Sequence, residues 1–249
     1  VVEVRLRGAR SVVDYSEGMT MRNASSVLLR IEEQSADENS VVTRLSDGAG
    51  NEYIHTLGYD APTGVFSVWV EYRNRSGREQ GLDMSWGRHG VRSERFGQIG
   101  SMPNRSWYPF AAVEGGGCVW AAMPEAPYSW QLEVYKLRET CALSGGLADY
   151  EFGHWCKKIA DGANFSTHKA YLWAGRGSAQ DACNAFVRFQ DNRLLSSGAL
   201  PESEREMPVL FNEYCTTWGV PSEENIREIL RRLEGIPVEY IVIDAGWYN

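Results

Sequence analysis

The segment that most constrains the fold is Tyr240–Ile243, where four consecutive side chains are apolar. A strand that buries one face alternates apolar and polar residues, whereas an unbroken apolar run is typical of a parallel strand covered on both faces. A second apolar run, Pro208–Asn212, precedes it, and a helical pattern lies between the two. The sequence therefore predicts a βαβ unit that begins at Met207, with strands over Pro208–Asn212 and Val238–Asp244.

The helix of this unit carries clear signals at both ends. Ser222 is a favourable N-cap, and Glu223 and Glu224 complement the positive end of the helix dipole. Gly235 and Pro237 end the pattern. One apolar stripe follows the helical spacing: Ile226, Ile229, Leu230 and Leu233. We predict a helix over residues 223–234.

The first 175 residues have a different pattern, with short β-branched and aromatic runs separated by Gly, Asn, Asp and Pro. The clearest strand is Val65–Arg73, where apolar and polar positions alternate and Gly64 precedes the run. Further predicted strands are Val27–Glu32, Val41–Leu45, Tyr53–Leu57, Cys118–Met123, Trp130–Lys136 and Lys169–Trp173. Many short strands without helices between them favour an antiparallel sandwich.

A helical pattern connects these two regions. Ser178 and Asp181 have the spacing of a capping pair, and the apolar residues that follow predict a helix over residues 179–194. The polar stretch Ser196–Glu206 is typical of a linker. We therefore divide the chain into a β domain over residues 1–177, a helix and linker over residues 178–206, and the start of an α/β domain over residues 207–249.

Composition excludes several classes of function. The net charge is −8 and the basic residues are scattered, which argues against a nucleic-acid partner. No run of eighteen apolar residues occurs, so we expect no membrane span. The five cysteines form no CxxC pair and no Cys/His cluster, so we expect no metal and no cofactor. A reduced, cytoplasmic location is the simpler expectation, and neutral substrates fit the charge best.

Several segments resemble the bacterial α-galactosidases of glycoside hydrolase family 36. They are Met207–Gly219, Tyr240–Tyr248, Arg95–Pro103, Ser129–Tyr135 and Leu143–Trp155. The resemblance implies a mostly β chain: an antiparallel β-supersandwich followed by a helical linker and the first βαβ unit of a truncated (β/α)8 barrel.

The resemblance also implies an activity. Members of this family are retaining glycosidases that remove terminal α-D-galactose from galactoside oligosaccharides, using one nucleophilic carboxylate and one acid/base. Those groups lie on later barrel strands, so we expect both beyond residue 249, no catalytic residue in this chain, and no activity of this chain alone. By analogy with the family, a homo-oligomer would form through the β domain.

Asp244 is the carboxylate to which the resemblance gives a substrate-binding role. It matches the first acid of the family's Asp-Asp-Gly-Trp motif, which binds galactose hydroxyls. A carboxylate that accepts two hydroxyl protons distinguishes an axial from an equatorial hydroxyl. Ala245 replaces the second Asp of the motif, which removes one hydroxyl ligand and leaves the identity of the sugar open. The alternative is that Asp244 caps a following helix.

Three further side chains are substrate-binding candidates because they sit where active-site loops emerge from barrel strands. Trp247 and Trp218 would wall the sugar-binding site, and Asn212 lies at the end of the first strand of the unit. The alternatives are that the tryptophans pack against the β domain and that Asn212 hydrogen-bonds to a neighbouring strand.

Other polar residues and other functions compete with this interpretation. We expect His154 and Trp155 to be structural and Glu125 and Glu133 to be solvated. The chain could instead be a non-catalytic carbohydrate-binding β-sandwich, a catalytically silent structural fragment, or part of an α-N-acetylgalactosaminidase with the same architecture.

Overall fold

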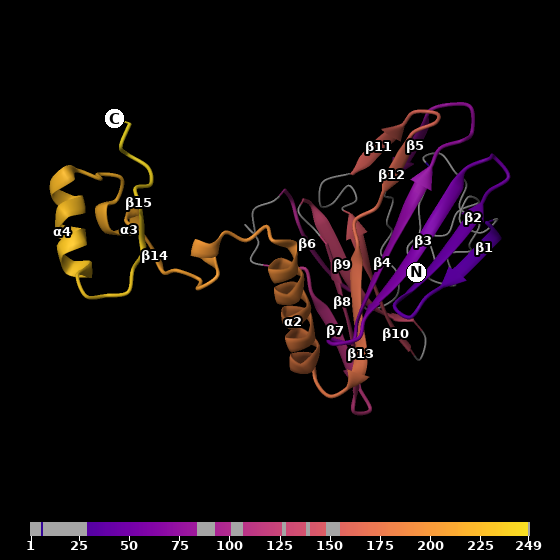
Figure 1. The fold of residues 1–249 in the computed structure, drawn as a ribbon, viewed down its shortest axis with the longest axis horizontal. Coiled ribbons are helices and arrows are strands. Elements are labelled where there is room, and N and C mark those ends of the chain that lie inside the picture. Colours follow the sequence, from indigo (N-terminus) through magenta and orange to yellow (C-terminus); the bar gives the residue numbers. More distant parts are fainter. Residues whose placement is uncertain are drawn as a thin grey trace. The chain divides into compact units, whose positions relative to one another are not determined.

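The computed structural model describes Leu6 and residues 29–83, 93–100, 107–125, 128–137, 140–147 and 155–248. The chain forms two compact units, residues 1–189 and residues 190–249 (Figure 1). None of the helices within the described residues is both long and apolar enough to cross a membrane.

The first unit is built on one large antiparallel sheet. Its strands run in the order β1-β2-β3-β4-β13-β8-β7, and β12 also pairs with β4. Four consecutive strands form a meander, and the far edge of β4 pairs with both β12 and β13. The bounds are β1 (Arg30–Ala36), β2 (Ser40–Ser46), β3 (Glu52–Asp60), β4 (Val65–Arg73), β7 (Ala111–Gly115), β8 (Cys118–Pro124), β12 (Asn164–Ser166) and β13 (Ala170–Arg176).

Two smaller antiparallel sheets pack on one face of the large sheet. The first contains β6 (Ser93–Gln98), β9 (Trp130–Leu137) and β10 (Thr140–Leu147), and the second pairs β5 (Gln80–Asp83) with β11 (Cys156–Ile159). Trp130 and Leu132 pack with Ala111 of β7 in one apolar cluster. Leu82 and Ile159 pack with Tyr53, Val70 and Tyr72 of β3 and β4 in another. The predicted antiparallel sandwich is confirmed for this part of the chain.

The helix α2 (Ala179–Ser197) covers part of the opposite face of the large sheet. Its buried side chains pack against β4, β8 and β13 and are Ala182, Ala185, Phe186 and Phe189. The predicted pair at its start is present, because the backbone N–H and the hydroxyl of Ser178 both donate to Asp181 Oδ2 at 2.9 Å.

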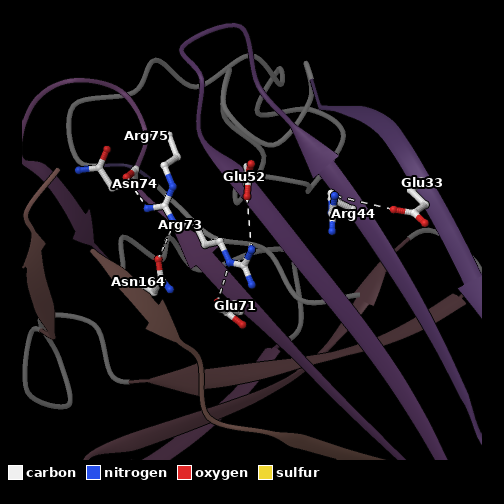
Figure 2. Close-up of polar contacts among 8 residues, drawn as sticks. All are labelled: Glu33, Arg44, Glu52, Glu71, Arg73, Asn74, Arg75 and Asn164. Carbon is white, nitrogen blue, oxygen red and sulfur yellow. Dashed lines mark hydrogen bonds and ion pairs between the residues drawn. The ribbon is translucent and has the colours of Figure 1, made fainter. Parts of the chain in front are cut away.

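Beyond α2, this face carries a network of charged side chains across neighbouring strands (Figure 2). Arg73 of β4 pairs with Glu71 at 2.7 Å and with Glu52 of β3 at 3.6 Å, and Arg44 of β2 pairs with Glu33 of β1 at 3.8 Å. These side chains are 29–67% exposed, so this part of the face is a solvated surface rather than a core. Such pairs contribute little to stability individually.

Three expectations from the sequence differ from the structure within the first unit. Glu133 is 1% exposed rather than solvated, since both faces of β9 are covered. Glu125 is partly buried and accepts hydrogen bonds from the Tyr171 hydroxyl at 2.9 Å and from the Lys169 N–H at 3.3 Å. The strand predicted at Val27–Glu32 is displaced, because β1 begins at Arg30, and residues 27 and 28 lie outside the described residues.

The second unit contains the predicted βαβ arrangement. Strands β14 (Leu210–Asn212) and β15 (Tyr240–Val242) are parallel, with Leu210 opposite Tyr240 and Asn212 opposite Val242. The connecting helix α4 (Glu223–Leu233) begins as predicted, because Ser222 accepts a hydrogen bond from the Asn225 N–H at 3.2 Å. Two short elements were not predicted: the 3-10 helix η2 (Glu202–Glu204) and the helix α3 (Tyr214–Thr217).

Candidate functional site

The candidate site lies at the carboxyl ends of β14 and β15. Asp244 follows the last residue of β15 by two positions, and its side chain is exposed. Parallel strands in α/β folds present their ligand-binding groups at this end, because the loops that follow the strands emerge there. The structure therefore leaves the Asp244 carboxylate open to a ligand from solvent.

Asn212 fixes the orientation of that carboxylate. Its amide Nδ2 donates to Asp244 Oδ2 at 2.8 Å, and its Oδ1 accepts a hydrogen bond from the Tyr214 N–H at 3.0 Å. Asn212 is the last residue of β14, so it is held by the strand ladder and by the first turn of α3 at once. A carboxylate has about four acceptor positions, so this bond leaves Asp244 able to accept hydroxyl protons from a ligand.

Glu213 is a site residue that sequence reasoning missed. It is 0% exposed, and its Oε1 accepts the Asp244 backbone N–H at 2.9 Å. The Thr217 hydroxyl donates to its Oε2, and its own N–H donates to the Val242 carbonyl at 3.2 Å. The only signal in the sequence was the position of Glu213 directly after Asn212, at the end of a predicted strand. The structure adds that this acid is buried, which is unusual unless its oxygens are hydrogen-bonded.

Two glycines bring the loops after β14 and β15 into direct backbone contact. Gly246 has φ of 103°, and a Cβ there would lie 2.0 Å from the Gly219 carbonyl oxygen. Gly219 has φ of 80°, a conformation that side chains with a Cβ rarely adopt. Trp218 and Trp247 are the direct neighbours of these glycines, so the contact holds both tryptophan-bearing loops at the end of the sheet that carries Asp244.

Both tryptophans present their indole rings to solvent. Trp218 is 75% exposed and lies 6.4 Å from the Tyr214 ring, whereas Trp247 is 68% exposed and lies 5.3 Å from the Tyr248 ring, both distances being between centroids. Exposed apolar groups rimmed by polar side chains are one mark of a ligand-binding surface. A fixed carboxylate beside open aromatic rings can accept hydroxyl protons and cover the C–H face of a polyol.

The other candidate residues of the sequence do not join this group. His154 lies outside the described residues, and Trp155 packs in the first unit, where its ring lies 5.5 Å from that of Phe165. Glu125 and Glu133 also belong to the first unit. Nowhere in the described part of the chain do three or more His, Cys, Asp or Glu side chains gather as metal ligands would.

Comparison with known proteins gives likeness at the level of structure. No family model and no curated protein sequence matches this chain. The α-galactosidase of Lactobacillus brevis is similar over 99% of this chain and 36% of its own length, with a TM-score of 0.65 and 14% identity. A variant of the family 36 α-galactosidase AgaA from Geobacillus stearothermophilus, solved with raffinose, is similar over 98% of this chain and 39% of its own, with a TM-score of 0.70 and 16% identity.

A second enzyme from Geobacillus stearothermophilus, the family 36 α-galactosidase AgaB, gives a TM-score of 0.65 at 16% identity, over 99% of this chain and 38% of that chain. At these identities the likeness establishes the fold. The chain spans well under half the length of each of these enzymes.

Proposed function

We propose that this chain is the N-terminal part of a retaining α-galactosidase of glycoside hydrolase family 36, and that Asp244 binds hydroxyls of the galactose unit. The fold likeness supports the proposal, because it extends over 98–99% of this chain in enzymes whose names state that activity. The sequence motifs that resemble the family also support it, since they include the segment Tyr240–Tyr248, which contains Asp244.

The observation that carries the proposal is the exposed Asp244 carboxylate held at the carboxyl ends of two parallel strands. An ionised carboxylate forms short, directional hydrogen bonds to hydroxyl groups, and a fixed one selects the hydroxyl geometry of one sugar over another. Trp218 and Trp247 would lie against the sugar ring, and Asn212 would act on the substrate through Asp244.

In this proposal β14 and β15 are the first two strands of a (β/α)8 barrel. Leu210 and Tyr240 are 54% and 40% exposed, and further barrel strands would cover such side chains. The chemistry would belong to two other carboxyl groups. One attacks the anomeric carbon while the other protonates the leaving oxygen, and that second group then takes a proton from the water that releases galactose. Asp244 would hold the sugar while these bonds change.

The test is hydrolysis of raffinose by the full-length protein and its Asp244→Asn variant. Loss of a charged acceptor should lower kcat/KM by at least about 100-fold, since a hydrogen bond to a charged group contributes about 1.5–3 kcal/mol and Asp244 would make two. The matched control is Asp191→Asn, which neutralises an exposed acid on α2 and should leave the rate unchanged.

Near-normal hydrolysis by Asp244→Asn would contradict the assigned role. Binding of galactose without release of galactose from raffinose would favour the non-catalytic carbohydrate-binding alternative. A preference for α-N-acetylgalactosaminides would identify the other enzyme of the same architecture.

A further inference from the structure

We infer that Glu213 is a positioning residue for the sugar-binding carboxylate, an inference that rests on the function proposed for Asp244. Glu213 is completely buried in a unit whose other buried side chain is apolar, Ile229, among the described residues after Phe189. A buried acid is costly unless its oxygens are hydrogen-bonded. Both Glu213 oxygens accept hydrogen bonds, one from Asp244 after β15 and one from Thr217 of α3.

Glu213 joins the two strand ends through two contacts and holds α3 through a third. Its N–H donates to the Val242 carbonyl, which continues the pairing of β14 and β15 beyond the ladder. Its Oε1 then accepts the Asp244 N–H at 2.9 Å, and its Oε2 accepts the Thr217 hydroxyl of α3. One side chain thereby fixes the backbone at Asp244 and the short helix that follows β14.

The backbone contact and the side-chain contact act on Asp244 from opposite ends. Glu213 holds the Asp244 N–H, whereas Asn212 holds the Asp244 carboxylate at 2.8 Å. With both contacts the carboxylate has a defined direction before a sugar arrives, and such preorganisation lowers the cost of binding. Without Glu213 the peptide before Asp244 is free to rotate, and Asn212 alone would direct the carboxylate.

A purely structural role and a positioning role differ in their kinetic effect. A group that only stabilises the unit changes the melting temperature and leaves the folded enzyme with normal constants. A group that positions a substrate-binding carboxylate changes the Michaelis constant of the folded enzyme, because misdirection of the carboxylate weakens substrate binding.

The experiment compares Glu213→Ala, Glu213→Gln and Thr217→Val in the full-length protein with raffinose as substrate. Glu213→Ala removes the acceptor of the Asp244 N–H and should lower kcat/KM about tenfold, mainly through a higher KM. Glu213→Gln keeps an oxygen for that N–H and an amide that can donate to Thr217, so it should restore kcat/KM to within about threefold of the wild type. Thr217→Val removes the donor to Oε2 but keeps the acceptor of the Asp244 N–H, so it should raise KM less than Glu213→Ala does.

A second readout follows the Asp244 N–H without any substrate. Hydrogen exchange of the peptide that contains Asp244 should be slow in the wild type and in Glu213→Gln, and faster in Glu213→Ala. If Glu213→Ala does not fold, Glu213→Asp replaces it, because the shorter acid cannot reach both donors from the same backbone position.

Two outcomes overturn the inference. One is a wild-type KM in Glu213→Ala or Glu213→Asp with only the melting temperature lowered, and the other is unchanged exchange at Asp244 in both variants. A wild-type protein that does not hydrolyse raffinose would contradict the proposed function instead, and the exchange measurement would still decide whether Glu213 holds the Asp244 backbone.

Discussion

The contacts inside the first compact unit differ in kind from the contacts inside the second. In the first unit three apolar clusters pack large side chains between the sheets and under α2. In the second unit Ile229 is the one apolar side chain below 9% exposure among the described residues, and Leu210 and Tyr240 of the strands remain substantially exposed. The ends of β14 and β15 are instead joined by hydrogen bonds of Asn212 and Glu213 and by two touching glycines.

This difference separates stability from function. The first unit gains its stability from the burial of apolar side chains. The free energy of this burial is roughly proportional to the apolar area removed from water and does not depend on the direction of individual contacts. The candidate site gains its geometry from a few directional contacts, each of which fixes one group. Substitutions in the first unit should therefore change the free energy of unfolding, and substitutions at the strand ends of the second should change binding.

The largest effect on stability is expected from Trp130→Ala. Trp130 of β9 is 2% exposed and packs against Ala111 of β7, so its removal leaves a cavity that should cost about 3–5 kcal/mol of unfolding free energy. Urea titration measures this loss, and Tyr128→Ala, at a side chain that is 62% exposed, is the control with little expected change. A loss below about 1 kcal/mol would mean that this cluster is not a core.

A smaller effect, confined to the second unit, is expected from Gly246→Ala. The new Cβ would meet the Gly219 carbonyl oxygen at 2.0 Å, so the two loops must separate. The positive φ of 103° adds a cost of about 1–2 kcal/mol. Raffinose hydrolysis by the full-length protein should fall while the urea midpoint of the first unit stays unchanged.

Gly198→Ala is the matched control for that substitution. Gly198 has φ of 64° and open space where a Cβ would stand, so alanine there carries the conformational cost without a clash. Equal loss of hydrolysis in both variants would show that the contact between Gly219 and Gly246 does not hold the site.

The smallest effect is a pH dependence within the first unit. Burial lowers the pKa of His55 on β3 below its ordinary value of 6.5. Well above pH 6.5 His55 is neutral in both folded and unfolded chains, so it does not change stability there. As pH falls below 6.5 the unfolded chain takes up the proton more readily, and stability is lost progressively until the folded pKa is passed.

Urea titrations between pH 8 and pH 5 test whether stability falls as the pH is lowered. The wild type should lose more stability over that range than His55→Gln. An identical pH dependence in His55→Gln and the wild type would contradict the assignment to His55.

The sequence predicted the elements whose patterns are local. The alternation in Val65–Arg73 gave the bounds of β4, and the cap and stripe around Ser222 located α4. The strand β10 was not predicted, and its two consecutive glycines are residues more typical of turns than of strands. A Cβ at Gly145 would meet Leu132 Cδ2 at 2.4 Å, so the glycine reflects packing between strands.

The candidate site was also predictable only in part, because some of its residues are defined by contacts between segments that are distant along the chain. Asp244, Trp247, Trp218 and Asn212 follow from their positions at predicted strand ends and from the family resemblance. The role of Glu213 depends on contacts with Thr217, Val242 and Asp244, which lie up to 31 positions away along the chain. Single-sequence patterns carry no information on such contacts between distant segments.

The most direct test of the account is the structure of the full-length protein with galactose bound, from which the distance between the Asp244 carboxylate and the nearest sugar hydroxyl can be measured. The account predicts a hydroxyl at about 2.5–2.8 Å from an Asp244 oxygen, with the sugar ring beside Trp218 and Trp247. A galactose molecule bound in the full-length protein without any contact to Asp244 would contradict it.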